Sequence, residues 1–212
     1  MQRLEVLYDR KSVRKFKDTK IPREDLLEMI ESATEAPSAK HQQPWFFVVV
    51  ENKELIEKMA DIVEESHKKI GDLAKNEKDQ KIHMSVIKYY TAFKNAPVVV
   101  LVYSKPYDMI EYKILKENNA SQETLDMLTS PESTGQSIGA AVENFILSAT
   151  NMGYGTCYMT GPNHAKKELE EVVGFEKEGY SLMSMISVGI AEDNTPDKPQ
   201  RKPLEKVYKF ID

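Results

Sequence analysis

The sequence predicts a single domain, spanning residues 1–212, that combines α-helices with buried β-strands. Apolar residues recur at helical spacing in residues 26–33, 55–63 and 138–149. Continuous apolar runs rich in β-branched and aromatic residues fill residues 45–50 and 98–103. A chain of 212 residues can bury a sizeable core in one domain, and no internal repeat or domain boundary divides it.

The first half of the chain is expected to alternate helices with two core strands. Residues 2–9 suit a short helix, and Pro22 followed by acidic residues suits the first turn of a second helix that ends near residue 36. A polar loop over residues 37–44 leads into a strand at 45–50. A helix over 52–70 follows, and the charged, then amphipathic residues 71–95 lead to the second strand at 98–103.

The second half is expected to begin with a surface excursion over residues 104–133 that contains short helices, because large apolar side chains are scattered among its charges. A strongly apolar helix over 134–151 should lie in the middle of the protein and end at Gly153. Strands at 154–159 and 181–190 flank a polar-faced helix at 164–173. A proline-rich tail then leads to residues 204–210.

Composition and charge exclude several classes of partner. The formal net charge is −5, which argues against general affinity for nucleic acid or for an anionic membrane surface. The longest apolar run, residues 96–103, is too short to span a bilayer, and no signal peptide is visible after Met1. The single cysteine fits a reducing compartment, so a cytoplasmic location is expected.

The most informative stretch is residues 10–16, RKSVRKF, in which Arg10, Lys11, Arg14 and Lys15 surround a serine hydroxyl. Cations this dense repel one another unless an anion lies nearby. Arginine forks, a lysine ammonium and a hydroxyl together suit the oxygens of a phosphate. The alternative, for this stretch taken alone, is a solvated basic strip.

Other motifs do not carry chemistry. Residues 135–139, GQSIG, match a nucleophile elbow, but a helix-initiating run precedes them instead of a strand, so Ser137 is not expected to be a nucleophile. The four histidines lack ligand spacing and there is no second cysteine, so no metal site is expected. His67 and His83 are expected to face solvent on helices, and Cys157 to be a small core residue.

Taken together, the motifs resemble the FMN-dependent nitroreductase family. The matching segments occur in the family's order and spacing: residues 10–16 (RKSVRKF), 36–39 (APSA), 43–48 (QPWFFV), 95–98 (NAPV), the helix and strand within 139–157, 188–190 (VGI) and 201–204 (RKPL). About 64–93 and 105–132 have no good match. The resemblance implies an α+β fold, in which helices flank a central, mostly antiparallel sheet, and an intertwined homodimer with two FMN molecules at its interface.

The resemblance also assigns residues to the cofactor. Arg10, Lys11 and Ser12 would hold the phosphate and ribityl chain, and Arg201 would close on the phosphate. Arg14 would reach the pyrimidine edge of the flavin, where negative charge develops on reduction. From the partner subunit, Pro37, Ser38, Ala39 and His41 would approach the flavin. Met159, Thr160 and Gly161 would contact the ring near its N5, where a glycine lets the backbone approach closely.

Two positions in the 37–44 loop depart from the common family pattern. His41 stands where many nitroreductases have asparagine, and Lys40 stands where glycine is frequent. Residues 37–45 and 201–204 are similar to the iodotyrosine deiodinase branch, which also has histidine at that position. That branch grips its substrate with a glutamate and a tyrosine four residues later, a pair that residues 51–93 lack. Lys40 is a candidate substrate contact that would favour anionic aromatic acceptors.

The expected function is therefore transfer of reducing equivalents from NAD(P)H, through FMN, to a nitroaromatic or quinone by a ping-pong mechanism. The flavin carries the chemistry, so no catalytic side chain is assigned. Reductive dehalogenation of a halogenated aromatic is one alternative, and a flavin-binding module without turnover is another.

Overall fold

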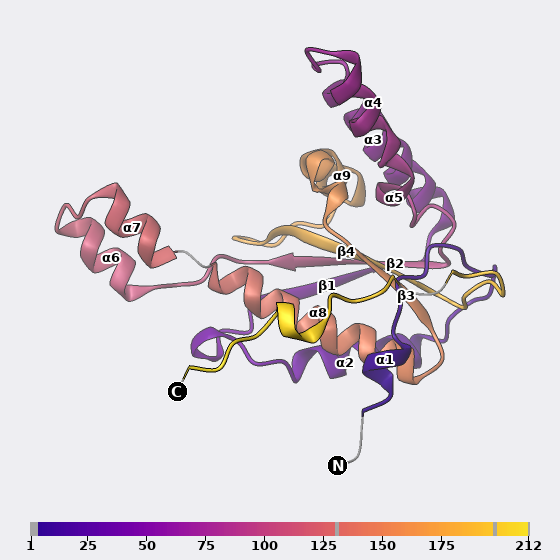
Figure 1. Ribbon diagram of the computed structural model, residues 1–212, viewed down its shortest axis with the longest axis horizontal. Coiled ribbons are helices and arrows are strands. Elements are labelled where there is room, and N and C mark those ends of the chain that lie inside the picture. The colour runs from indigo at the N-terminus through magenta and orange to yellow at the C-terminus, as the bar shows by residue number, and fades with distance from the viewer. Residues whose placement is uncertain (1–3, 130–131, 197–198, 212) are drawn as a thin grey trace.

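The computed structural model describes residues 4–129, 132–196 and 199–211, and its centre is one four-stranded antiparallel sheet (Figure 1). The strands are β1 (Trp45–Val50), β2 (Val98–Ser104), β3 (Gly155–Met159) and β4 (Ser181–Gly189), in the order β1-β2-β4-β3. All four predicted strands are confirmed. Helices lie on both faces of the sheet, so the predicted α+β class is confirmed too.

The central strand β2 shows why its sequence is apolar throughout. Every one of its seven residues is buried. Val98, Val100 and Val102 enter one hydrophobic core, while Val99 and Leu101 enter the other. Because successive side chains point to opposite faces, a strand covered on both sides must be apolar at every position.

Two helices cover one face of the sheet. They are α2 (Arg23–Thr34) and α8 (Ser133–Asn151), which pack against each other and against the β2 side chains of that face (Figure 1). Helix α8 ends as predicted: Gly153 has φ 87° and the Tyr154 N–H donates to the carbonyl of Ala149 at 2.8 Å. This hydrogen bond joins residues five positions apart and is the Schellman termination that glycine permits.

The other face carries α3 (Lys53–Gly71) and α9 (Lys166–Val173), with the 3₁₀ turn η2 (Gly161–Ala165) between β3 and α9. The Asn52 side chain accepts the Leu55 N–H at 3.1 Å and caps α3. The short helices α4 (Glu77–Ser85) and α5 (Ile87–Tyr90) continue from α3, and α4 lies alongside it in Figure 1.

Three further segments lie outside these layers. The helices α6 (Ile110–Glu117) and α7 (Gln122–Thr129) form the predicted excursion, which projects from one end of the sheet (Figure 1). The short α1 (Val6–Asp9) contacts α8, and η3 (Leu204–Lys206) lies in the tail. Residues 2 and 3 of the predicted first helix lie outside the described residues.

Candidate functional site

The basic stretch lines a cleft of about 750 Å³. Arg10, Lys11, Ser12 and Arg201, the four residues assigned to the phosphate and ribityl chain, line it together with Arg14, which was assigned to the flavin ring. Lys15 and Lys88 add two more cations. No carboxylate is among the residues that line the cleft in the described part of the chain. A concave surface with cations and no acid attracts an anion strongly.

Two buried side chains, Val13 and Phe16, fix the position of the basic stretch against the sheet. Val13 donates its N–H to the Thr156 carbonyl at 2.8 Å, and Ser12 and Phe16 make isolated β-bridges to Thr156 and Ala191. The Val13 and Phe16 side chains are buried, so the intervening Arg14 and Lys15 stay exposed. The apolar residues within RKSVRKF therefore fix the backbone from which the cations project.

Two strand-end glycines make this docking possible. A Cβ on Gly155 would lie 2.6 Å from Val13, and one on Gly189 would lie 2.7 Å from Phe16. Both distances are far below van der Waals contact, so the edge of the sheet accepts the basic stretch because it presents glycine.

Other contacts shape the cleft from α5 and from the C-terminal segment. The Lys11 ammonium donates to the Thr195 carbonyl at 3.3 Å, and the Arg14 guanidinium lies 5.4 Å from the centroid of the Tyr89 ring. Sequence reasoning did not identify Tyr89 or Lys88, because nothing local places α5 beside residues 10–14.

Residues 37–44 form a second candidate site, built on an unusual backbone. Lys40, His41 and Gln43 have φ values of 47°, 52° and 46°, a left-handed conformation that costs energy for side chains other than glycine. Hydrogen bonds stabilise it: the Gln43 N–H donates to Ser38 Oγ at 3.0 Å, and the Ala39 N–H donates to Ser137 Oγ at 3.3 Å. Such strain is typical of loops that present groups to a ligand.

Ser137 thus has a role that sequence reasoning missed. It lies inside α8, where its hydroxyl donates to the Ser133 carbonyl at 2.9 Å, so the prediction that it is no nucleophile elbow is confirmed. The same oxygen accepts the Ala39 N–H and ties η1 (Ala39–His41) to the buried helix.

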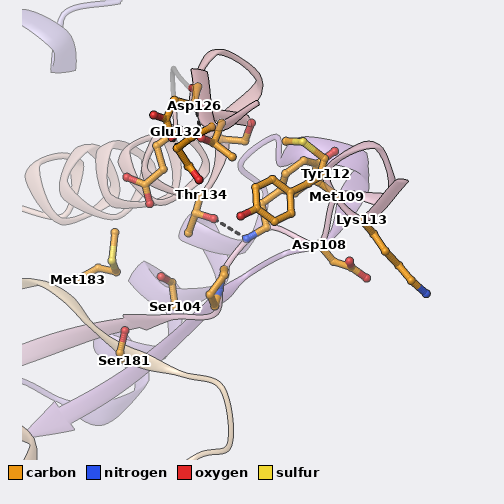
Figure 2. Close-up of a pocket in the computed structure, with 15 residues that line it drawn as sticks. Ser104, Asp108, Met109, Tyr112, Lys113, Asp126, Glu132, Thr134, Ser181 and Met183 are labelled. Carbon is orange, nitrogen blue, oxygen red and sulfur yellow. Dashed lines mark hydrogen bonds between the residues drawn. The ribbon is translucent and has the colours of Figure 1, made fainter. Parts of the chain in front are cut away.

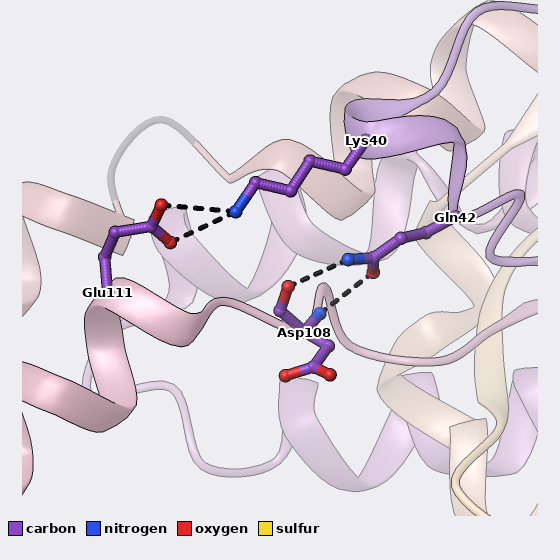
Figure 3. Close-up of polar contacts among 4 residues, drawn as sticks. All are labelled: Lys40, Gln42, Asp108 and Glu111. Carbon is purple, nitrogen blue, oxygen red and sulfur yellow. Dashed lines mark hydrogen bonds and ion pairs between the residues drawn. The ribbon is translucent and has the colours of Figure 1, made fainter.

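Polar contacts also connect this loop to the excursion (Figure 3). The Lys40 ammonium lies 3.2 Å from both carboxylate oxygens of Glu111, and the Gln42 side chain donates to the Asp108 carbonyl and accepts its N–H at 2.8 and 3.0 Å. The hydrogen bond to Glu111 raises the pKa of Lys40. Lys40 is therefore paired, and its charge is partly offset in this arrangement.

A pocket of about 570 Å³ lies between the excursion and the sheet (Figure 2). Its apolar lining includes Tyr107, Tyr112 and Met183, and its polar lining includes Ser104, Ser181 and Thr134. The Thr134 hydroxyl accepts the Tyr107 N–H at 2.8 Å, which fixes the start of the excursion.

The 37–44 loop and the cleft lined by the basic stretch lie at opposite ends of the sheet. Trp45, directly after the 37–44 loop, pairs with Ser104, which pairs with Ser181. The basic stretch instead joins the end marked by Gly155 and Gly189. A six-residue strand such as β1 spans roughly 20 Å at about 3.3 Å per residue. One chain therefore does not bring Ser38 and His41 to the Arg10 cleft.

The third predicted group follows β3. Met159 ends that strand and is buried, and Thr160 precedes the η2 turn that begins at Gly161. A Cβ on Gly161 would lie 2.3 Å from the Tyr90 ring, so glycine is required for α5 to pack there. The neighbour of Gly161 in the structure is Tyr90, and contact of Gly161 with the flavin stays a prediction.

The histidine prediction needs correction. His67 is fully buried, and His83 is only partly exposed and stacks on it with ring centroids 3.7 Å apart, so they do not simply face solvent. The error arose because α4 folds back on α3 and covers the His67 position. No group of three or more His, Cys, Asp or Glu side chains that could hold a metal occurs among the described residues.

The prediction for Cys157 is confirmed. Its side chain is buried, and burial raises the pKa of the thiol although the nearby Arg14 opposes this. Within the described part of the chain, no helix is both long and apolar enough to cross a membrane.

An antiparallel sheet with helices on both faces, edged by an anion-attracting cleft, is the architecture of the nitroreductase fold. The model of the Nitroreductase family matches residues 7–190, and the chain belongs to this family.

Similar proteins share the architecture over nearly the whole chain. A BluB-like flavoprotein from Clostridium difficile 630 is 39% identical, with a TM-score of 0.92 and full coverage of both chains. A putative NAD(P)H nitroreductase, YdgI from Bacillus subtilis, is 26% identical over 90% of this chain and 88% of its own. A structure of iodotyrosine deiodinase bound to FMN and 3-iodo-L-tyrosine is 25% identical, with a TM-score of 0.69 and coverage of 97% and 98%.

Proposed function

We propose that this protein is an FMN-dependent oxidoreductase that takes reducing equivalents from NAD(P)H and passes them to a small nitroaromatic or quinone. The observation that carries the proposal is the cleft in which Arg10, Arg14 and Arg201 converge with no carboxylate in the described lining. A phosphate carries nearly two negative charges at neutral pH and suits this set of donors. The FMN in the iodotyrosine deiodinase structure and the NAD(P)H in the name of the B. subtilis relative support the cofactor and the donor.

We expect the chain to hold the cofactor in three places. Arg10, Lys11, Ser12 and Arg201 would hold the phosphate, and Arg14 would offset negative charge on the flavin ring. Met159, Thr160 and Gly161 would present backbone to the ring. FMN, when bound, would supply the hydride and electron transfer, and the chain would bind and orient it and limit access of water.

We further propose that each site is shared between two copies of the chain. The 37–44 loop and the Arg10 cleft lie at opposite ends of one sheet, so Pro37, Ser38, Ala39 and His41 can approach that cleft only from a partner. The ion pair between Lys40 and Glu111 joins the loop to the excursion, so the aromatic pocket beside it would enter the shared site as one unit. Contact of Lys40 with the acceptor stays a prediction.

The proposal predicts ping-pong kinetics, because donor and acceptor would use the same exposed flavin face in turn. Anaerobic NAD(P)H should bleach the flavin absorption of the purified protein, and a quinone should restore it. Initial rates at varied donor and acceptor should then give parallel double-reciprocal lines. Intersecting lines, which require a ternary complex, would contradict the shared face, and no bleaching would leave a flavin-binding module without turnover.

Reductive dehalogenation is a second candidate, supported by the iodotyrosine deiodinase structure. His41 agrees with that branch, but residues 51–93 lack a glutamate with a tyrosine four residues later. Iodide release from 3-iodo-L-tyrosine by the reduced protein separates the two functions. Release at a rate comparable to quinone reduction would favour the dehalogenase.

A further inference from the structure

Three of the four histidines gather behind the Gly161 turn, although the chain separates them widely. His67 comes from α3, His83 from α4 and His164 from η2. The His67 ring centroid lies 3.7 Å from that of His83 and 5.4 Å from that of His164. Tyr90 of α5 packs edge-on against His67 at 5.4 Å and lies 5.8 Å from His164.

The hydrogen bonds of the stacked pair show which ring nitrogen carries a proton. His67 Nε2 lies 2.8 Å from the His83 carbonyl, and His83 Nε2 lies 2.9 Å from the His67 carbonyl. Because a carbonyl oxygen only accepts, both Nε2 atoms carry the proton. In the neutral ring Nδ1 then bears a lone pair, and His67 Nδ1 is buried with no hydrogen-bond partner among the described residues.

The protonated nitrogen of His164 follows by a similar argument. The Ser66 hydroxyl donates to the His164 carbonyl at 3.2 Å, so its oxygen accepts from His164 Nδ1–H at 2.9 Å. The lone pair is on Nε2, which is also buried and without a partner among the described residues. A second proton on either ring would therefore create a buried cation whose new N–H has no acceptor.

The charged and titratable groups around the cluster reinforce this state. Burial lowers the pKa of both His67 and His164, and the neighbouring histidines lower that of His164 further. Glu168 of α9 opposes this at His164. Tyr90 is the titratable group that α5 contributes, and α4 contributes His83.

The cluster connects directly to the proposed flavin site. The Tyr90 ring lies against Gly161, where a Cβ would come within 2.3 Å of it. On the opposite side α4 approaches α3 closely, since a Cβ on Gly71 would lie 2.9 Å from Met84 Sδ and 3.3 Å from the His83 ring. Tyr89, which directly precedes Tyr90 on α5, faces Arg14 in the cleft. Any movement of α4 and α5 would therefore change both the turn and the cleft wall.

We propose that His67, His83 and His164 form an imidazole cluster that positions Tyr90 against the Gly161 turn, and that protonation of its buried members, His67 and His164, in mild acid releases α4 and α5 from it. The consequence for flavin binding rests on the proposed function; the consequence for stability does not. The three histidines and Tyr90 are positioning residues that act through the Gly161 backbone.

The sign of the pH effect follows from linkage. Above the ordinary histidine pKa of 6.5 the rings of His67 and His164 are neutral in both folded and unfolded chains, so the contribution to stability is fully present. As the pH falls below 6.5, these two histidines take up protons in the unfolded chain but not in the folded chain, where their pKa is lowered. Stability is lost progressively until the pH reaches the lowered pKa of the folded state.

The test compares the wild type with the triple variant His67→Gln, His83→Gln, His164→Asn. The glutamine amides offer donors where each Nε2–H was, and the asparagine amide does so for Nδ1–H, but none of them titrates. The wild type is expected to lose roughly 5 °C more in Tm than the triple variant between about pH 7 and about pH 5. Lys69→Gln, which removes an exposed charge from α3, should retain the wild-type pH dependence.

Two further measurements separate positioning from stability alone. Hydrogen exchange of residues 77–90, compared at the same pH, should be faster in the wild type than in the triple variant at about pH 5. FMN affinity should fall more in the wild type over the same range. The phosphate itself titrates near pH 6, but it affects both proteins equally, so the difference between them is the readout.

Equal pH dependence of Tm and of exchange in the two proteins would overturn the proposal. Should the triple variant fail to fold, proton NMR of the wild-type histidine rings decides: two rings that stay neutral well below pH 6.5 support the cluster, and normal titration of all of them refutes it. If neither protein binds FMN, the proposed function fails, while Tm and exchange still test the cluster.

Discussion

Replacing Arg10 or Arg201 with alanine is expected to weaken FMN binding by about 1.5–3 kcal/mol each, or roughly 10- to 150-fold. Both residues line the cleft, and the described lining of the cleft contains no carboxylate that could pair with them. Each guanidinium would therefore make charge-assisted hydrogen bonds to the phosphate. The dissociation constant is measured by quenching of flavin fluorescence on titration of the apoprotein.

Arg23→Ala is the matched control. Arg23 is an exposed arginine whose guanidinium pairs with Glu51 at 2.7 Å, on a helix that does not line the cleft. Its removal should leave FMN affinity within about twofold, because exposed ion pairs contribute little. Losses that are equal in the control and in the cleft variants would show that net charge, and not the cleft, governs binding.

The second large effect is expected when two defective subunits are combined. One parent carries Arg10→Ala with Arg201→Ala, which removes the phosphate side. The other carries Ser38→Ala with His41→Ala. The first change removes the hydroxyl that accepts the Gln43 N–H and stabilises the strained loop, and the second removes the imidazole ring that contacts the Gln43 side chain. Each homodimer should retain little flavin.

In the heterodimer, one site receives both defects and the other receives none, because the two halves come from different chains. Flavin content should therefore rise to about half of the wild-type value, as the symmetry of a two-site dimer requires. The heterodimer is isolated through different affinity tags on the two chains. Flavin content no higher than that of the parents would mean that each site is built within one chain.

The sequence predicted those features of the fold that depend on local pattern. The strands β1 and β2 followed from continuous apolar runs, because a strand buried on both faces is apolar at successive positions. The end of α8 followed from Gly153, because a residue in the left-handed conformation is usually glycine. The anion-attracting character of residues 10–16 was also visible, since four cations in seven residues require no tertiary information.

Features that arise from contacts between distant segments were not predictable in this way. The pairing of Lys40 with Glu111 joins residues 71 positions apart, and no pattern near Lys40 indicates it. The left-handed conformation of Lys40, His41 and Gln43 contradicts residue preference and depends on Ser38 and Ser137.

His67 is a different case, because a signal was present. Met59, Val63 and His67 follow one another at a spacing of four, so the imidazole continues the buried stripe of α3. A histidine on an apolar helical face should have been assigned to the interior. Its partners His83 and His164 could not be identified, since they depend on how α4 and η2 pack against α3.

The central claim is that FMN lies between two copies of this chain. Sedimentation of the purified protein at micromolar concentration, detected by flavin absorption, tests it most directly. We expect the flavin to sediment with a particle of twice the 24.2 kDa chain mass, and removal of FMN to weaken the dimer. Flavin that sediments with a single chain would contradict the shared site.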